Sequence, residues 1–344
     1  MNELRIVSKH GILILGLIER VSRMSKVINL KIKNNLLNLD ATEIVSLIKE
    51  KRVSITEVTE TLIEHIQNVN SKLNAVVEDR FEEALQEAKE KDEQIDKIDF
   101  SSQPLYGLPV SIKESLDVKG MKTTGGIVHR KDILMNSDAE AVRQLKEAGA
   151  IVLCKTNTPA LCFCHETDNK LYGRTNNTWN MKRTEGGSSG GEAALIGVGG
   201  TPVGLSSDIG GSIRIPSHFN GVVGFKPGKF QVSSEGHFPP DRIPLKTRMS
   251  SIGPIGKSVR DCELIYKIIA KREKRRRALY EKMKVEILPN DNGFPLSKST
   301  AQALDKVHKF VSQYYDTTLS IPPSFNDSSV IWQEIMSIAG GKEI

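Results

Sequence analysis

The chain has 344 residues, enough for one large α/β domain or two smaller domains and far too many for a mini-protein. Its composition, 38% hydrophobic and 26% charged, is close to the globular average and excludes disordered and fibrous classes. Lys and Arg outnumber Asp and Glu by only 48 to 42, so the charge does not indicate nucleic-acid binding. Four cysteines are too few for a disulfide scaffold and lack zinc-site spacing, so we expect reduced thiols and no metal.

Residues 1–37 form an apolar and basic segment. Its apolar run, 11–18, has eight residues, whereas a membrane-spanning helix needs about 20, and no secretory cleavage site follows. Basic side chains around the run are typical of a helix that lies on an anionic membrane. We therefore expect an intracellular, membrane-associated protein, peripheral or N-terminally anchored. It would be cytoplasmic if the segment is a disordered leader or a helix packed on the domain.

Helices are predicted between residues 40 and 98. Asp40 with Glu43, and Ser54 with Glu57, have the spacing of capping boxes and mark two helix starts. Apolar residues then recur at helical spacing from the second start. A short strand is expected over 73–77, followed by a helix over 79–94 whose many charges indicate a solvated face.

From residue 105 onward, short apolar strands alternate with amphipathic helices. We expect strands over 108–112 and 150–154, separated by a helix that Ser137 and Glu140 cap and that ends at Gly149. A strand, a helix and a second strand imply a crossover in a parallel or mixed sheet. Residues 186–228 then contain thirteen glycines in 43 positions, which indicates backbone forced close to a neighbour.

Three features of this region can carry chemistry. Gly186-Gly-Ser-Ser-Gly-Gly191 precedes a predicted helix, as an anion-binding loop would, but lacks the lysine of a phosphate loop. In the turn 208–216, two glycines before Ser212 leave main-chain amides free to meet an oxyanion, although no G-x-S-x-G elbow surrounds the serine. Lys113 stands where an apolar strand ends, and a buried lysine can be a neutral base. Each feature alone also has a plain structural explanation: a tight turn, a structural serine or a solvent-facing charge.

Together these residues resemble the amidase signature family of serine hydrolases. Ser188 follows Lys113 by 75 residues, and Ser212 follows Ser188 by 24, which agrees with the family's intervals. The resemblance is dense over residues 39–228 and looser to about residue 340. Residues 74–80 and 172–177 look like the fatty-acid amide hydrolase branch, second-isoform type.

The resemblance implies roles for individual residues. Lys113 would be the base, Ser188 a bridging serine on a cis peptide bond, and Ser212 the nucleophile, in a relay that cleaves amide or ester bonds without a cofactor. The amides expected to hold the oxyanion belong to Ile209, Gly210, Gly211 and Ser212. Ser189, Asp208 and Arg214 would support the site from a second layer.

The resemblance also implies a fold and a partner. We expect an α/β fold, a mixed central sheet flanked by helices on both faces, within an amidase domain over 38–344 whose C-terminal part is incomplete. The substrate would be a small hydrophobic amide, such as a fatty-acid amide, at a membrane surface. A homodimer is compatible with this interpretation, and no nucleic acid is expected.

Several alternatives stay open from the sequence. The chain could be a shortened homologue that keeps the site without activity, or an amidotransferase subunit that hydrolyses glutamine. A Ser/His/Asp triad is a further enzymatic alternative, although none of His129, His165, His218 and His237 is followed by a carboxylate in a recognised order. The basic run 271–277 is either a solvated helix end or junction, or a nuclear or nucleic-acid signal.

Overall fold

The computed structural model describes residues 35–240, 249–271, 284–288, 295–321, 325 and 327–343. Almost all of the predicted membrane segment, 1–37, and of the basic run, 271–277, lies outside these residues. The chain divides into two compact units, one ending at Lys271 and the other beginning at Arg272. The proposed site residues all belong to the first unit.

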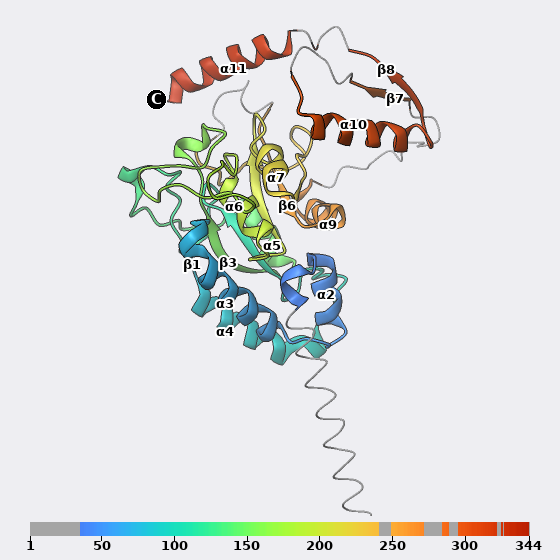
Figure 1. Ribbon diagram of the computed structural model, residues 1–344. Coiled ribbons are helices and arrows are strands. Elements are labelled where there is room, and N and C mark those ends of the chain that lie inside the picture. Colours follow the sequence, from blue (N-terminus) through green and yellow to red (C-terminus); the bar gives the residue numbers. More distant parts are fainter. Residues whose placement is uncertain are drawn as a thin grey trace, which may run out of the picture. The chain divides into compact units, whose positions relative to one another are not determined.

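The first unit contains a mixed six-stranded sheet with the strand order β1-β3-β2-β4-β6-β5 (Figure 1). Strand β2 lies between β3 and β4 and is parallel to both, whereas β1 and β6 are antiparallel to their neighbours β3 and β4. The mixed sheet predicted from the sequence is therefore confirmed. The strands are β1 (Val76–Asp79), β2 (Pro109–Lys113), β3 (Ile151–Thr156), β4 (Val203–Asp208), β5 (Val223–Gly224) and β6 (Ser251–Gly256).

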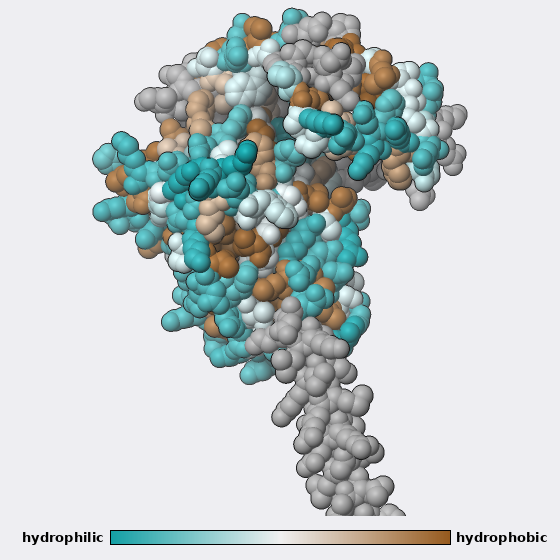
Figure 2. Space-filling view, in the orientation of Figure 1, coloured by the Kyte–Doolittle hydropathy of each residue, from teal (hydrophilic) through white to brown (hydrophobic). Residues whose placement is uncertain are grey.

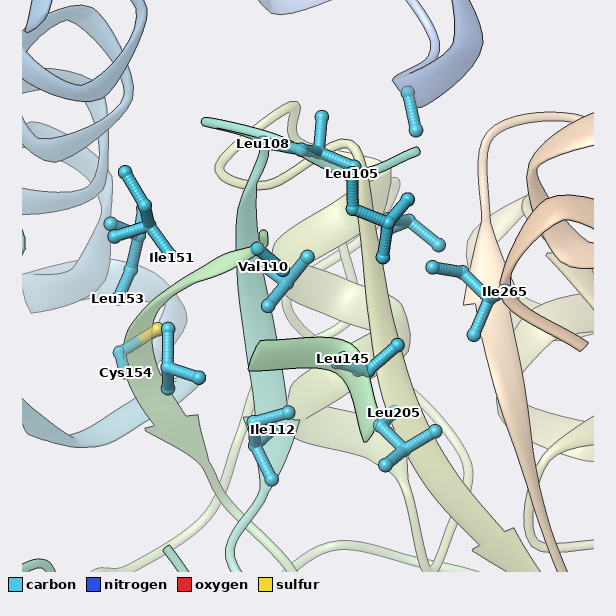
Figure 3. Close-up of a cluster of buried hydrophobic side chains, with 14 of the residues drawn as sticks. Leu105, Leu108, Val110, Ile112, Leu145, Ile151, Leu153, Cys154, Leu205 and Ile265 are labelled. Atoms are coloured by element: carbon cyan, nitrogen blue, oxygen red, sulfur yellow. The ribbon is translucent and has the colours of Figure 1, made fainter. Parts of the chain in front are cut away.

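Helices flank both faces of this sheet. On one face, side chains of the sheet pack in a large apolar core with helices from both ends of the unit; Figure 3 shows Val110 and Ile112 of β2 near Leu145 and Ile265. On the other face, Ser111 and Lys113 of β2 contact residues at and just before α6. The helices are α2 (Ala41–Lys49), α3 (Ile55–Leu73), α4 (Phe81–Gln94), α5 (Glu140–Glu147), α6 (Gly190–Gly197), α7 (Arg214–Asn220) and α9 (Val259–Ile269).

This alternation along β2 places the lysine. Successive residues of a strand point to opposite faces, so Val110 and Ile112 enter the core while Lys113 turns toward α6. Strand β2 ends at Lys113, the position expected from the sequence. The fold therefore buries an amine at the end of a central strand.

Most local predictions are confirmed, with shifted boundaries. Both capping boxes form, at Asp40 with Glu43 and at Ser54 with Glu57. The strand expected over 73–77 is displaced to Val76–Asp79 because α3 continues to Leu73. The helix expected from residue 79 begins at Phe81 and buries only two alanines, so its charges face solvent as predicted.

The predicted cap at Ser137 is wrong. Helix α5 begins at Glu140 after Ala139, and no side chain caps it. The neighbouring Asp138 instead accepts a hydrogen bond from the amide of Lys119 at 2.8 Å and forms an ion pair with Lys146 at 2.8 Å. The carboxylate therefore joins a distant loop to the helix, which a local capping pattern does not reveal.

The visible face of the first unit is mostly hydrophilic, with apolar patches between charged side chains (Figure 2). The second unit contains the parallel pair β7 (Lys284–Ile287) and β8 (Asp316–Leu319). It also contains α10 (Lys298–Val311) and α11 (Ser328–Glu343). The short 3-10 helices are η1 (Leu36–Asn38), η2 (Ile95–Lys97), η3 (Val128–Arg130) and η4 (Ala160–Cys162).

Candidate active site

A fully buried lysine meets two serine hydroxyls at the end of β2. Lys113 Nζ lies 2.7 Å from Ser188 Oγ and 3.1 Å from Ser207 Oγ. Among the described residues, no carboxylate oxygen lies within ion-pair distance of this amine. Burial lowers the pKa of Lys113, because the charged ammonium loses hydration that two hydroxyl partners do not replace.

The glycine-rich loop brings Ser188 to the lysine. The Gly187–Ser188 peptide bond is cis, as the resemblance implies. A Cβ on Gly187 would lie 2.7 Å from the carbonyl oxygen of Cys164, so only glycine allows the loop to approach the segment 164–166. Two threonines also hold the loop: Thr158 donates to the carbonyl of Ser188, and Thr167 donates to that of Gly186, each at 3.0 Å.

The loop is joined directly to the turn that carries the second serine. The amide of Ser189 donates to the carbonyl oxygen of Ser212 at 3.1 Å, and Ser189 Oγ lies 3.3 Å from the carbonyl of Ser207. Ser212 itself is 4% exposed. No side-chain hydrogen bond of Ser212 Oγ is present within the described part of the chain, so this hydroxyl is not held back by a partner.

The carboxylate of Asp208 shapes that turn. It accepts hydrogen bonds from the amides of Gly211 at 2.8 Å and Ile213 at 3.0 Å, and it binds the guanidinium of Arg214 through two contacts of 2.9 Å. Burial would raise the pKa of Asp208, but Arg214 and the amides outweigh burial and lower it. Asp208 and Arg214 are therefore scaffold, as the sequence analysis expects.

These bonds narrow the expected oxyanion hole. The amide of Gly211 already donates to Asp208, so it is committed to the scaffold rather than free for an oxyanion. The amides of Ile209, Gly210 and Ser212 have no hydrogen-bond acceptor among the described residues. Ile209 and Gly210 are also partly exposed, which leaves their backbone accessible to a ligand.

A buried carboxyl group lies behind the lysine. Burial raises the pKa of Glu192 in α6 to about 7, against the hydrogen bonds from Ser111 and from Thr156, the latter at 2.6 Å. This carboxyl is therefore only partly ionised at neutral pH, which limits the charge that would hold Lys113 protonated. The sequence analysis missed Glu192, whose place in an apolar helix of low periodicity was the available signal.

Three further residues around Lys113 were also missed. Ser207 bonds the amine, and His237 Nε2 lies 2.9 Å from Ser207 Oγ. The partly buried thiol of Cys162 faces both Lys113 and His237; burial alone would raise its pKa, but these two neighbours lower it to about 5. No local motif contains these residues, because their contacts with the lysine cross 94 residues or join separate loops.

The other histidines lie elsewhere. His165 is exposed and its ring lies 3.1 Å from the carbonyl of Gly210, while His129 and His218 are exposed. Within the described residues, no histidine forms a hydrogen bond with Ser212. The geometry therefore lacks the histidine contact that a Ser/His/Asp triad requires.

Comparison with known proteins places this geometry in a family. Residues 57–308 match the family model named Amidase. The chain belongs to the amidase family. Relatives of this family member include zebrafish (Danio rerio) fatty-acid amide hydrolase 2-B, 36% identical over 89% of this chain and 61% of the relative. Human (Homo sapiens) fatty-acid amide hydrolase 2 is 33% identical over 90% of this chain and 61% of the relative.

Solved structures of amidases show the same fold. A bacterial aryl acylamidase of the amidase signature family matches with a TM-score of 0.75 and 28% identity, over 88% of this chain and 65% of that one. A fatty acid amide hydrolase matches with a TM-score of 0.74 and 26% identity, over 85% of this chain and 54% of that one. This amidase chain thus spans about three fifths of the length of the fatty-acid amide hydrolase 2 proteins.

A search of the described helices for a membrane span found none that combines sufficient length with sufficient apolar character.

Proposed function

We propose that this chain is a serine hydrolase that cleaves carboxylic amide bonds through Lys113, Ser188 and Ser212. The observation that carries the proposal is the buried Lys113 amine, 2.7 Å from Ser188 Oγ. Ser189, the next residue, is hydrogen-bonded through its amide to Ser212. An amine, a bridging hydroxyl and a hydroxyl in a glycine-rich turn are the parts that a proton relay needs.

In this mechanism the neutral Lys113 amine takes the proton of Ser188 as Ser188 takes that of Ser212. The Ser212 oxygen attacks the substrate carbonyl, and the free amides of Ile209, Gly210 and Ser212 stabilise the oxyanion. The proton then returns along the same path to the leaving nitrogen, which departs as an amine. Water hydrolyses the acyl ester on Ser212 and restores both hydroxyls.

We further propose hydrophobic amides, such as fatty-acid amides, as the substrate class. Support comes from the extent of the similarity: the two fatty-acid amide hydrolase 2 proteins align over about nine tenths of this chain. The glutamyl-tRNA(Gln) amidotransferase of Sulfurihydrogenibium contributes a relative that is 35% identical and aligns over 66% of this chain. Turnover of a fatty-acid amide series, compared with turnover of glutamine, separates the two substrates.

A fluorophosphonate probe tests the proposed nucleophile. We expect the wild-type chain to be labelled and Ser212→Ala to lose labelling while remaining folded by circular dichroism. Ser206→Ala is the matched control, because Ser206 is a buried serine on β4 whose hydroxyl has no hydrogen-bond partner. Absence of labelling in folded wild-type protein would contradict the proposal and favour a homologue that keeps the site without activity.

We also propose that the apolar and basic N-terminal segment, 1–37, brings the protein to anionic membranes. The support is its sequence alone, an apolar run flanked by basic residues. Flotation with anionic vesicles should recover the full chain and leave a variant lacking residues 1–34 in the soluble fraction. Equal flotation of both proteins would contradict this role of the segment.

A further inference from the structure

His237 lies beside the segment that follows the catalytic strand. Its backbone pairs with Leu116 in an isolated antiparallel β-bridge. On either side of it, the amide of Asp117 donates to the carbonyl of Gly236, and the amide of Phe238 donates to that of Ser115, each at 2.8 Å. The loop 236–238 is therefore held against the residues just after Lys113, and the imidazole is partly buried there.

The contacts of the imidazole give its hydrogen bonds a direction. Nδ1 lies 2.9 Å from the carbonyl oxygen of Pro239, and a carbonyl only accepts, so Nδ1 carries the hydrogen. In a neutral imidazole, Nε2 is then an acceptor. Its near neighbour is Ser207 Oγ at 2.9 Å, with Ser115 Oγ farther away at 3.4 Å. The Ser207 hydroxyl hydrogen is thus donated to His237.

The direction continues to the lysine. A serine hydroxyl has one hydrogen, so Ser207 Oγ has only lone pairs left for Lys113 Nζ, 3.1 Å away. The amine must then donate an N–H to Ser207. Its own lone pair is left for the other near partner, Ser188 Oγ at 2.7 Å.

We propose that His237 is a positioning residue that acts through Ser207: it keeps the Ser207 hydroxyl turned away from Lys113, so that the amine lone pair stays directed at Ser188. This inference rests on the proposed function, in which Lys113 takes the proton of Ser188. Without the imidazole acceptor, the Ser207 hydroxyl is free to donate to the amine lone pair and compete with Ser188.

The assignment differs from a histidine base. Among the described residues, the ring of His237 forms no hydrogen bond with Ser188 or Ser212, so it does not touch the reacting atoms. It reaches the relay through one hydroxyl, and Cys162 and Asp117 are the other ionisable side chains that interact with it.

A double-mutant cycle tests the pathway through Ser207. We expect His237→Phe to lower kcat about 100-fold with little change in KM, since misplaced catalytic groups cost about this much. Ser207→Ala should lower kcat as well, and the double variant should fall no further than the larger single effect, whereas Ser207→Thr, which retains a hydroxyl, should keep most activity. His129→Phe, an exposed histidine on η3, is the control. Multiplicative losses in the double variant would overturn the proposal.

Nitrogen-15 NMR of the histidine rings tests the hydrogen-bond direction without turnover. The expected spectrum shows His237 protonated at Nδ1 and unprotonated at Nε2, with an Nε2 resonance that shifts in Ser207→Ala. A ring protonated at Nε2 would overturn the proposal. Either spectrum is decisive even if the wild-type chain does not label with fluorophosphonate, an outcome that would count against the proposed function alone.

Discussion

Lys113 and Lys155 are both fully buried on neighbouring parallel strands, but their partners differ in charge. Lys113 meets the hydroxyls of Ser188 and Ser207. Lys155 donates to Thr123 Oγ1 at 2.8 Å and lies in the field of three carboxyl groups, those of Glu114, Glu78 and Asp117. Burial lowers the pKa of Lys155 to about 8 against the pull of these acids. The first environment suits a base, and the second suits a structural cation.

Substituting each lysine by methionine should separate these two roles. Lys113→Met should abolish turnover, with a loss of at least about 100-fold, without lowering the free energy of unfolding, because an apolar side chain replaces an amine with hydroxyl partners. Lys155→Met should destabilise the protein by about 3–5 kcal/mol, because buried acids lose their cation. Turnover assays and urea unfolding of both variants provide the measurements. Near-normal turnover by Lys113→Met would rule out the relay.

The pH dependence of turnover should report the environment of Lys113. The amine is a base only when neutral, so activity should rise as the pH passes upward through its pKa. Because burial lowers that pKa from its ordinary value of 10.5, the rise should be complete at a lower pH than an exposed lysine would allow. A pH profile of kcat/KM measures it, and a rise centred at 10.5 or above would contradict a buried base.

Cys162→Ala should displace this profile. The thiolate favours the charged form of Lys113, so its removal should lower the pKa of the amine further. The acid limb of kcat/KM should therefore move to lower pH. Cys164→Ala, on an exposed neighbouring thiol, is the matched control and should leave the profile in place. A shift to higher pH in Cys162→Ala would show that the sign of this interaction is wrong.

Asp208 should matter more than its ion-pair partner. Asp208→Ala removes the acceptor of two turn amides, so kcat should fall about 100-fold as Ser212 moves. Unfolding free energy should fall by about 3 kcal/mol, since hydrogen bonds to a buried charge are lost. Arg214→Ala should cost less than about 1.5 kcal/mol, because the guanidinium side chain is 55% exposed. Equal effects of the two substitutions on urea unfolding would contradict this ranking.

Gly191→Ala should destabilise the loop-to-helix junction. An added Cβ would lie 2.4 Å from the amide nitrogen of Asn157 and 2.9 Å from the carbonyl oxygen of Ala75. Since backbone atoms cannot move aside easily, we expect a loss of about 3 kcal/mol in thermal or urea unfolding. Gly228→Ala, where the near atoms belong to the exposed side chain of Gln231, should stay within about 0.5 kcal/mol. Equal stability of the two variants would refute the steric explanation.

The sequence by itself determined the features that depend on neighbours along the chain. Capping boxes at Asp40 and Ser54, the strand ending at Lys113 and the glycine-rich loop before α6 all follow from short-range spacing, because local hydrogen bonds and chain geometry set them. The family resemblance added the two serines and the cis bond. Position within a motif was therefore enough to name the main candidates.

Only the tertiary structure decided what surrounds those candidates. It committed the Gly211 amide to Asp208, moved Asp138 to a distant loop, and placed Ser207 and His237 behind Lys113. Strands β2 and β4 are neighbours in the sheet but separated by about 90 residues of chain, and His237 arrives from a later loop. Such contacts arise from packing between remote segments, and no periodicity or local spacing encodes which side chains will meet.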